Sequence, residues 1–417
     1  MVNPSVIALA GSEVFMFQSV RRPDVLVIVL AAAGILMVSM GIRQSFGLFV
    51  APISSSTGMG IAAISFAMAI AQLSWGAAQP VAGALADRFG AGPVLVGGLL
   101  LLAAGCALTP FASGTLGLVL SVGLLTAVGS GISGFSVLIG AASQRLPAEA
   151  RGTASGIINA GGSFGQFVFA PLSQKLIQSV GWMGAMWALA LTALATIPLI
   201  AKFTGGNAAP VKHDNDKGMR HAIGEALGDR SYALLSFGFF TCGFHIAFLV
   251  THLPGEVSLC GLPADVASWS LAIIGLANIA GSLYAGACVA KYRSKSVLAA
   301  MYGSRALLIA VYLLLPKTEW TFYIFAAGLG FTWLATVPPT AAIVGKLFGT
   351  RYLATLFGIA LFAHQIGGFF GAWLGGIALT VQGDYSWMWY ADMALAALAA
   401  VANLPIREAP VAAPALR

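Results

Sequence analysis

Charged residues are the scarcest feature of this sequence. Lys, Arg, Asp and Glu together make up 8% of its 417 residues, whereas a soluble globular domain carries roughly 25%. The 21 basic and 14 acidic side chains cannot cover the water-facing surface of a chain of this length. Because 59% of the residues are hydrophobic, disorder is excluded as well. The composition therefore predicts a protein that lies in a lipid bilayer.

Several kinds of site are absent too. No run of five or more Lys or Arg occurs, so the net charge of +7 does not indicate a nucleic-acid partner. The cysteines have neither CxxC nor metal-ligand spacing, and we interpret them as packing residues: Cys106, Cys242, Cys260 and Cys288. No P-loop and no HExxH motif is present. We therefore expect no enzymatic activity, no metal and no cofactor.

Long apolar runs fill the chain instead. A helix needs about 20 apolar residues to cross the hydrocarbon layer, and the runs do not alternate as the strands of a membrane barrel do. The sequence therefore predicts an all-α integral membrane protein with twelve transmembrane helices. We expect them near residues 25–50, 61–84, 93–112, 116–142, 153–178, 182–202, 232–255, 266–288, 297–315, 320–345, 353–380 and 387–405.

The basic residues fix the expected orientation. If the N-terminus is cytoplasmic, only Lys175 and Lys317 of the 21 basic residues fall on outer loops, and only Arg43 and Arg305 fall inside spans. All the others lie on cytoplasmic segments, which is the bias that sets membrane topology. Both termini are therefore predicted to be cytoplasmic.

The chain also repeats itself. Shifting the first half by 202 residues places Gly41 on Gly243, Arg43 on His245 and Pro52 on Pro254. We expect a cytoplasmic tail (1–24), a six-helix bundle (25–202), a polar cytoplasmic linker (203–231) with a short helix at Met219–Leu227, a second six-helix bundle (232–405) and a cytoplasmic tail (406–417). Parallel repeats of this kind place the substrate between the halves, near the middle of the membrane.

The loop after the second span carries a family resemblance. Its sequence, GALADRFGAGPVL (residues 83–95), resembles the signature loop of the major facilitator superfamily, Gly-x-Leu-x-Asp-Arg-x-Gly, through Gly83, Leu85, Asp87, Arg88 and Gly90. The resemblance implies a secondary transporter, a monomer, in which the halves rock about a central site. It also implies that Asp87 and Arg88 gate the inward face.

Two features bear on the branch of that family. Drug exporters carry an arginine in the fourth span and a Gly-Pro motif in the fifth, but residues 116–142 are uncharged and the fifth span has its only proline at Pro171. The tenth and eleventh spans resemble the bacterial branch similar to monocarboxylate and oxalate/formate transporters. Where monocarboxylate carriers have Asp and Arg in the eighth span, this chain has Asn278 and Ser282.

The expected function is therefore proton-coupled transport of a small, monocarboxylate-like organic anion across a bacterial inner membrane. The alternative is export of larger amphipathic compounds on the same fold.

Ionisable residues inside spans are costly, so each one is a candidate for function. No acid falls at the core of a predicted span, and Asp392 lies near an outer helix end. A cationic interior suits a substrate that supplies its own negative charge. Arg43 is the predicted carboxylate clamp, because its fork offers two parallel N–H donors. His245 occupies the repeat-related position, where we expect it to face Arg43 across the cavity and to carry the proton.

The remaining candidates are less specific. His364 and Gln365 follow each other in the eleventh span, and His364 is a second proton-coupling candidate. Arg305 in the ninth span either binds substrate or stabilises the second half, since that helix is peripheral in the superfamily. Asn159, Gln166 and Trp333 complete the predicted substrate site, each with helix packing as the alternative. His252 is expected to be solvated at the outer end.

Overall fold

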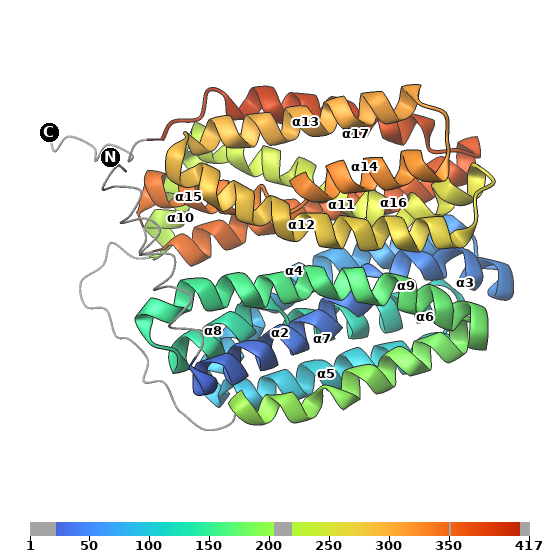
Figure 1. Cartoon of the computed structure of the whole chain (residues 1–417), viewed down its shortest axis with the longest axis horizontal. Helices are drawn as coiled ribbons and strands as arrows, with labels where there is room; N and C mark the ends of the chain where they lie inside the picture. Colours follow the sequence, from blue (N-terminus) through green and yellow to red (C-terminus); the bar gives the residue numbers. More distant parts are fainter. Residues whose placement is uncertain (1–21, 204–218, 350–351, 409–417) are drawn as a thin grey trace, which may run out of the picture.

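A computed structural model describes residues 22–203, 219–349 and 352–408, and within them every regular element is a helix (Figure 1). The first half contains the following elements, with η3 a π-helix and the other η segments 3-10 helices: α2 (Pro23–Gln44), η1 (Phe46–Phe49), α3 (Val50–Thr57), α4 (Ile61–Phe89), α5 (Ala91–Leu108), η2 (Thr109–Phe111), α6 (Gly114–Leu118), η3 (Val119–Thr126), α7 (Ala127–Ile132), α8 (Phe135–Arg145), α9 (Ala148–Ala195) and η4 (Ile197–Phe203).

The second half begins after the linker. Its elements are α10 (Met219–Gly228), α11 (Arg230–Leu259), α12 (Ala264–Lys291), α13 (Ser294–Leu314), α14 (Glu319–Thr332), α15 (Val337–Phe348), α16 (Leu353–Gln382) and α17 (Ser386–Asn403). The short helix α10 lies where the sequence predicts one. Most of the linker and both tails lie outside the described residues.

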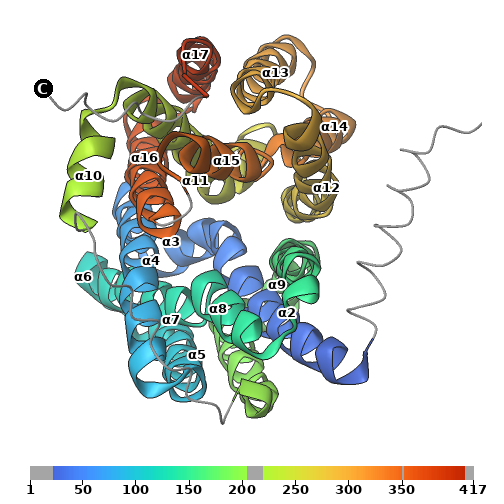
Figure 2. The ribbon, with the colours of Figure 1, turned by 90° about the vertical axis from the view of Figure 1, so that its left-hand side faces the viewer.

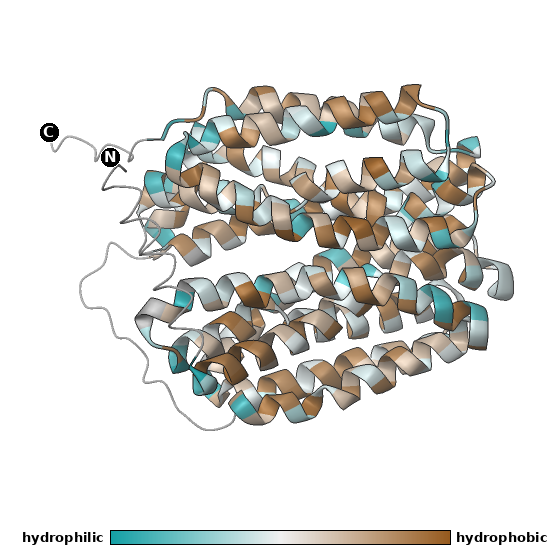
Figure 3. Ribbon diagram, viewed as in Figure 1, coloured by the Kyte–Doolittle hydropathy of each residue, from teal (hydrophilic) through white to brown (hydrophobic). Residues whose placement is uncertain are grey.

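The prediction of an all-helical membrane protein is confirmed. Ten helical segments of the described residues are long and apolar enough to cross a membrane. One of them, Thr153–Phe203, turns at Gly181, whose φ of 73° is a conformation that glycine adopts without strain. With that turn counted, and with α17 as a further helix of 18 residues, the structure is consistent with twelve crossings. Figure 3 shows hydrophobic residues along most of the helix lengths and hydrophilic ones mainly toward the two ends.

The two halves form separate bundles that meet along two seams. Viewed from the end, α2 to α9 lie in one bundle and α11 to α17 in the other (Figure 2). The seams are α4 against α16 and α9 against α12. The start of α2, the end of α17 and α10 lie at the same end of the molecule (Figure 1), as an even number of crossings requires; we take this end as the cytoplasmic one.

Several predicted spans contain 3-10 segments or breaks, and the first, fourth and tenth bear on the site. The first changes to 3-10 geometry at η1, which begins three residues after Arg43. The fourth contains η3 and breaks between Ile132 and Phe135, and the tenth breaks between Thr332 and Val337. Pro338 near the start of α15 lacks the N–H that a continuous helix needs. The fourth and tenth spans are related by the repeat, so both halves place irregular backbone at mid-span.

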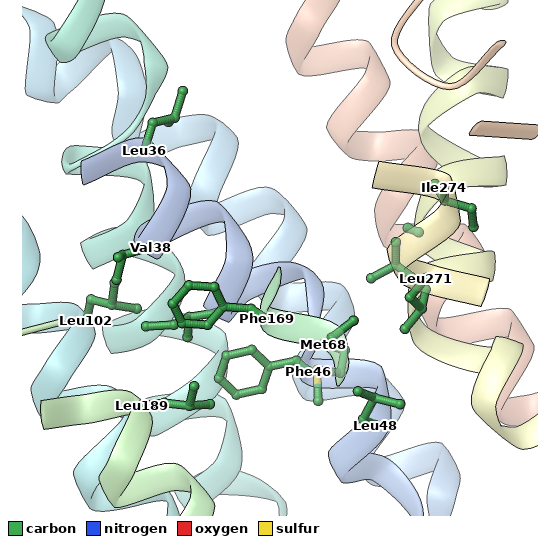
Figure 4. Packing of buried hydrophobic residues seen from close by; sticks show 14 of the residues in the cluster. Leu36, Val38, Phe46, Leu48, Met68, Leu102, Phe169, Leu189, Leu271 and Ile274 are labelled. Atoms are coloured by element: carbon green, nitrogen blue, oxygen red, sulfur yellow. The ribbon is translucent and has the colours of Figure 1, made fainter. Parts of the chain in front are cut away.

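Large apolar side chains fill the interior of each half. In the first half, Phe46 of η1 lies together with Phe169 and Leu189 of α9, while Leu271 and Ile274 of α12 belong to the opposing bundle (Figure 4). Glycines let the helices within a half approach closely; a side chain at Gly165 of α9 would collide with the backbone of Met37. This packing holds each half as a rigid body around the space between them.

Candidate functional site

Arg43 lies on α2 at the surface where the two halves meet. Its Nη2 donates a hydrogen bond to Oε1 of Gln72 on α4, and its guanidinium carbon lies 4.3 Å from the centre of the Trp75 ring. Gln72 and Trp75 are three residues apart and share one face of α4. An amide and an aromatic face thus orient the cation without neutralising it.

A small cavity adjoins this arginine. It measures about 30 Å³, enough for a water molecule or two. Its lining comes from both halves: Arg43, Phe46, Gly47, Met68, Ala71, Gln72, Val122, Thr126, Ala127, Val250 and Thr251. Arg43 makes one hydrogen bond to the described part of the chain, so most of its five N–H donors remain for a bound anion.

The outer side of this cavity is closed by contacts between the halves. A side chain at Gly47 would collide with the carbonyl of Val250 on α11, and one at Gly376 of α16 would collide with Ser65 of α4. The ring of Phe66 packs against Phe369 at 6.2 Å and Trp373 at 5.8 Å. We call this group of residues the outer seal. It separates Arg43 from the outer face.

The same seams diverge toward the cytoplasm. Along α4 and α16, Gly76 approaches Gln365 at mid-span. The two helices are antiparallel, so Gly83, seven residues after Gly76, lies opposite Gly358, seven residues before Gln365 and two turns closer to the cytoplasm. Both glycines have no atom within 4 Å of a side chain placed there. The two helices are therefore not packed against each other at these glycines, on the side that we take as cytoplasmic.

The second seam has the same form. Asn278 of α12 donates from Nδ2 to Oγ of Ser163 on α9 (2.8 Å), and a side chain at Gly275 would collide with this part of α9. Two turns toward the cytoplasm, Gly156 and Gly286 are both free of neighbours within 4 Å. Of the residues predicted from the sequence, Gln166 is buried in this seam and Asn159 is partly exposed on the same helix.

His364 and Gln365 lie in the α16 part of the site. Gln365 is buried against Gly76 of α4, and its Nε2 is 3.3 Å from Nδ1 of His364. Its Oε1 has no hydrogen-bond partner. The His364 ring packs on Phe239 of α11, with 4.9 Å between ring centres. The two side chains thus lie on different sides of α16: Gln365 toward the seam and His364 toward the second half.

His245 does not face Arg43, which corrects the arrangement expected from the repeat. Only 1% of its surface is exposed, and its Nδ1 lies 2.5 Å from Oδ2 of Asp392 on α17. The side chain thus points into the second half. Asp392 is completely buried, so the expectation that spans have no acid in their core is also wrong. The repeat does not predict the direction of this side chain.

Arg305 and Trp333 lie away from the cavity as well. Arg305 is 1% exposed and donates to the carbonyls of Thr332 and Trp333 and to Cys242 Sγ. These carbonyls lie at the broken end of α14, where helical partners are missing. The ring of Trp333 packs against His245 at 6.1 Å. In this conformation both residues therefore stabilise the break in the tenth span, and neither lines the cavity beside Arg43.

This arrangement makes a testable prediction about stability. We expect Arg305→Leu to lower the melting temperature of the purified protein, because two buried carbonyls lose a charged donor at a cost of roughly 1–3 kcal/mol each. Arg305→Lys restores a charge but not the planar fork, and should be intermediate. Arg220→Leu, on the exposed surface of α10, is the control. Equal melting temperatures for Arg305→Leu and wild type would contradict this structural role.

Two further predictions meet the structure only in part. Arg88 is exposed, with its guanidinium 5.1 Å from the Phe89 ring, and the side chain of Asp87 lies outside the described residues. His252 is buried rather than solvated: its Nε2 lies 2.7 Å from the carbonyl of Ala372. Trp75 was not among the predicted site residues, although its spacing from Gln72 on α4 is a signal in the sequence.

Comparison with known proteins agrees with this architecture. The sequence model of the Major Facilitator Superfamily matches residues 29–372. The chain is 25% identical to monocarboxylate transporter 13 of Rattus norvegicus over 357 residues, which cover 83% of this chain and 80% of that protein. It is 26% identical to the oxalate:formate antiporter of Oxalobacter formigenes over 373 residues, which cover 86% and 85%.

Solved structures show the same fold. The crystal structure of a D-xylose-proton symporter superposes with a TM-score of 0.71 at 14% identity and covers 92% of this chain and 98% of its own. A bacterial homologue of the human lysosomal transporter Spinster, in an inward-facing and occupied conformation, superposes with a TM-score of 0.68 and covers 92% of this chain and 94% of its own. The two packed bundles and the family match lead to one conclusion: the chain is a member of the Major Facilitator Superfamily.

Proposed function

We propose that the protein transports a small, monocarboxylate-like organic anion by alternating access, coupled to protons. The observation that carries this proposal is Arg43, a cation between the two halves whose neighbours are an amide and an aromatic ring rather than an acid. A carboxylate would complete its fork of donors. An organic cation would find no counter-ion among the residues that line the cavity.

The relatives support this substrate class. Monocarboxylate transporter 13 and the oxalate:formate antiporter bear the names of small carboxylates, and both match most of the chain. We further propose that Gln72 and Trp75 orient Arg43, and that Asn159, Gln166, His364 and Gln365 line the path as the halves move. The protein is proposed to act as a monomer in a bacterial inner membrane.

Uptake into proteoliposomes tests the proposal. Uptake of labelled lactate, formate and oxalate is measured with and without a pH gradient that is acidic outside the liposomes. Uptake of amphipathic dyes is measured in the same way, with and without unlabelled carboxylates as competitors. We expect the acid gradient to accelerate carboxylate uptake above that of protein-free liposomes. Transport of the dyes without any carboxylate uptake would contradict the proposal and favour the exporter.

A further inference from the structure

We infer that the coupling proton binds to Nε2 of His245, in a buried site that His245 forms with Asp392 inside the second half, away from the substrate. This inference rests on the proposed anion transport. Its starting point is an unpartnered atom: Nδ1 of His245 is hydrogen-bonded to Asp392 at 2.5 Å, whereas Nε2 is buried and has no partner. Oδ1 of Asp392 is likewise unpartnered.

The chemistry of the pair determines which atom takes the proton. A carboxylate accepts a hydrogen bond, so Nδ1 of the neutral imidazole carries the hydrogen that Oδ2 of Asp392 accepts. The lone pair on Nε2 is then free to bind H⁺. Binding adds one N–H bond and breaks none, and Asp392 remains ionised beside the imidazolium. The charge of the pair changes from −1 to zero.

Several charged and titratable groups lie near this pair. Arg305 donates to the carbonyl of Trp333, whose ring packs on His245, and Tyr302 of α13 lies below the same guanidinium at 5.5 Å. Cys242 stands one turn before His245 on α11 and accepts a hydrogen bond from Arg305. His364 of α16 packs on Phe239, further along α11. In the charge count of the second half, Arg305 offsets Asp392 when His245 is neutral, and the charge of Arg305 is in excess when the pair is protonated.

Charge conservation then links this site to Arg43. An anion on Arg43 lowers the buried charge of the first half by one, and a proton on His245 raises that of the second half by one. The empty protein and the protein loaded with one anion and one proton therefore bury the same net charge. One proton per anion is thus the stoichiometry at which loading leaves the net buried charge unchanged, and we infer symport with this ratio.

The pair also has a physical connection to the moving seam. The backbone N–H of Leu334, next to Trp333, donates to Oδ1 of Asn278 (2.9 Å), and Asn278 donates to Ser163 of the first half. When the halves separate along this seam, the Ser163 contact is lost and the segment that covers His245 is released. This is the route by which the pair gains access to water.

Asp392→Asn tests the inference. Asparagine keeps the shape but leaves Arg305 unbalanced, so the second half has the charge of the protonated state permanently. We expect this variant to lose acid-driven accumulation of the anion completely. Exchange of labelled for unlabelled anion needs only the loaded protein, so we expect it to persist and to have the same rate at pH 6 and pH 8. Glu256→Gln removes another buried acid of this half, one that binds Tyr312, and should still accumulate the anion.

The outcomes separate this inference from the proposed function. If Asp392→Asn accumulates the anion at the wild-type level, the proton site is overturned and the proposed function is not. The same holds if the variant loses both exchange and accumulation, because the pair would then be structural. Absence of carboxylate transport in wild-type protein would instead refute the proposed function.

Discussion

Arg43→Gln should reduce uptake of the transported carboxylate by about 100-fold or more, because a charge-assisted hydrogen bond is worth roughly 1.5–3 kcal/mol and the fork can make two. Glutamine keeps a polar side chain beside Gln72, so the loss reflects the missing charge and fork. The measurement is the initial rate of uptake in proteoliposomes that contain equal amounts of protein.

Arg43→Lys separates the two contributions. Lysine keeps the charge but offers a point donor rather than a planar fork, so uptake should recover only in part. Arg220→Gln removes a basic residue from the exposed surface of α10 and should leave uptake unchanged. If Arg43→Gln transports as fast as the control, Arg43 does not bind the substrate.

The second large effect is expected at the cytoplasmic ends of the seams. Gly83 and Gly358 continue the register of the contacts between α4 and α16, and neither has an atom within 4 Å of a side chain placed there. We expect them to come into contact when the protein closes toward the cytoplasm. Gly83→Trp combined with Gly358→Trp should therefore fold normally and bind substrate from the cytoplasmic side, but lose transport, because the closed state cannot form.

A matched substitution and a crosslink test this closure. Gly97→Trp lies on α5, also with no neighbour within 4 Å, and should transport normally because α5 does not contribute to either seam. In a protein without its four native cysteines, Gly83→Cys and Gly358→Cys should crosslink during turnover and remain uncrosslinked in the inward-open state. Active transport by the double Trp variant would contradict this closing movement.

The sequence predicts the fold well because the relevant physical quantities are local. The lengths of apolar runs and the distribution of basic residues are read directly along the chain, and they give the helices and the two halves that the structure contains. Arg43 is found for the same reason: a lone cation in an apolar run is conspicuous. Trp75, which contacts Arg43, is not conspicuous, because tryptophan is a common residue in membrane helices.

The sequence-based predictions are wrong about the rotation of helices about their axes and about contacts between residues far apart in the chain. The repeat places His245 at the depth of Arg43, but a helix can present a given depth on any side, and the partner Asp392 lies on α17, far along the chain. Pro338 marks the break between α14 and α15 in the sequence, but the stabilisation of this break by Arg305 depends on a third helix. Such contacts follow from the packing of helices and not from the pattern of any one of them.

The most direct test of the central claim is equilibrium binding of the best-transported carboxylate to purified wild-type protein and to Arg43→Gln, each compared with the uncharged amide of the same acid. If Arg43 holds the carboxylate, wild-type protein binds the acid and not the amide, and Arg43→Gln binds the acid about 100-fold more weakly. Equal affinity of the two proteins for the acid would contradict the account, because the anion would then be recognised elsewhere.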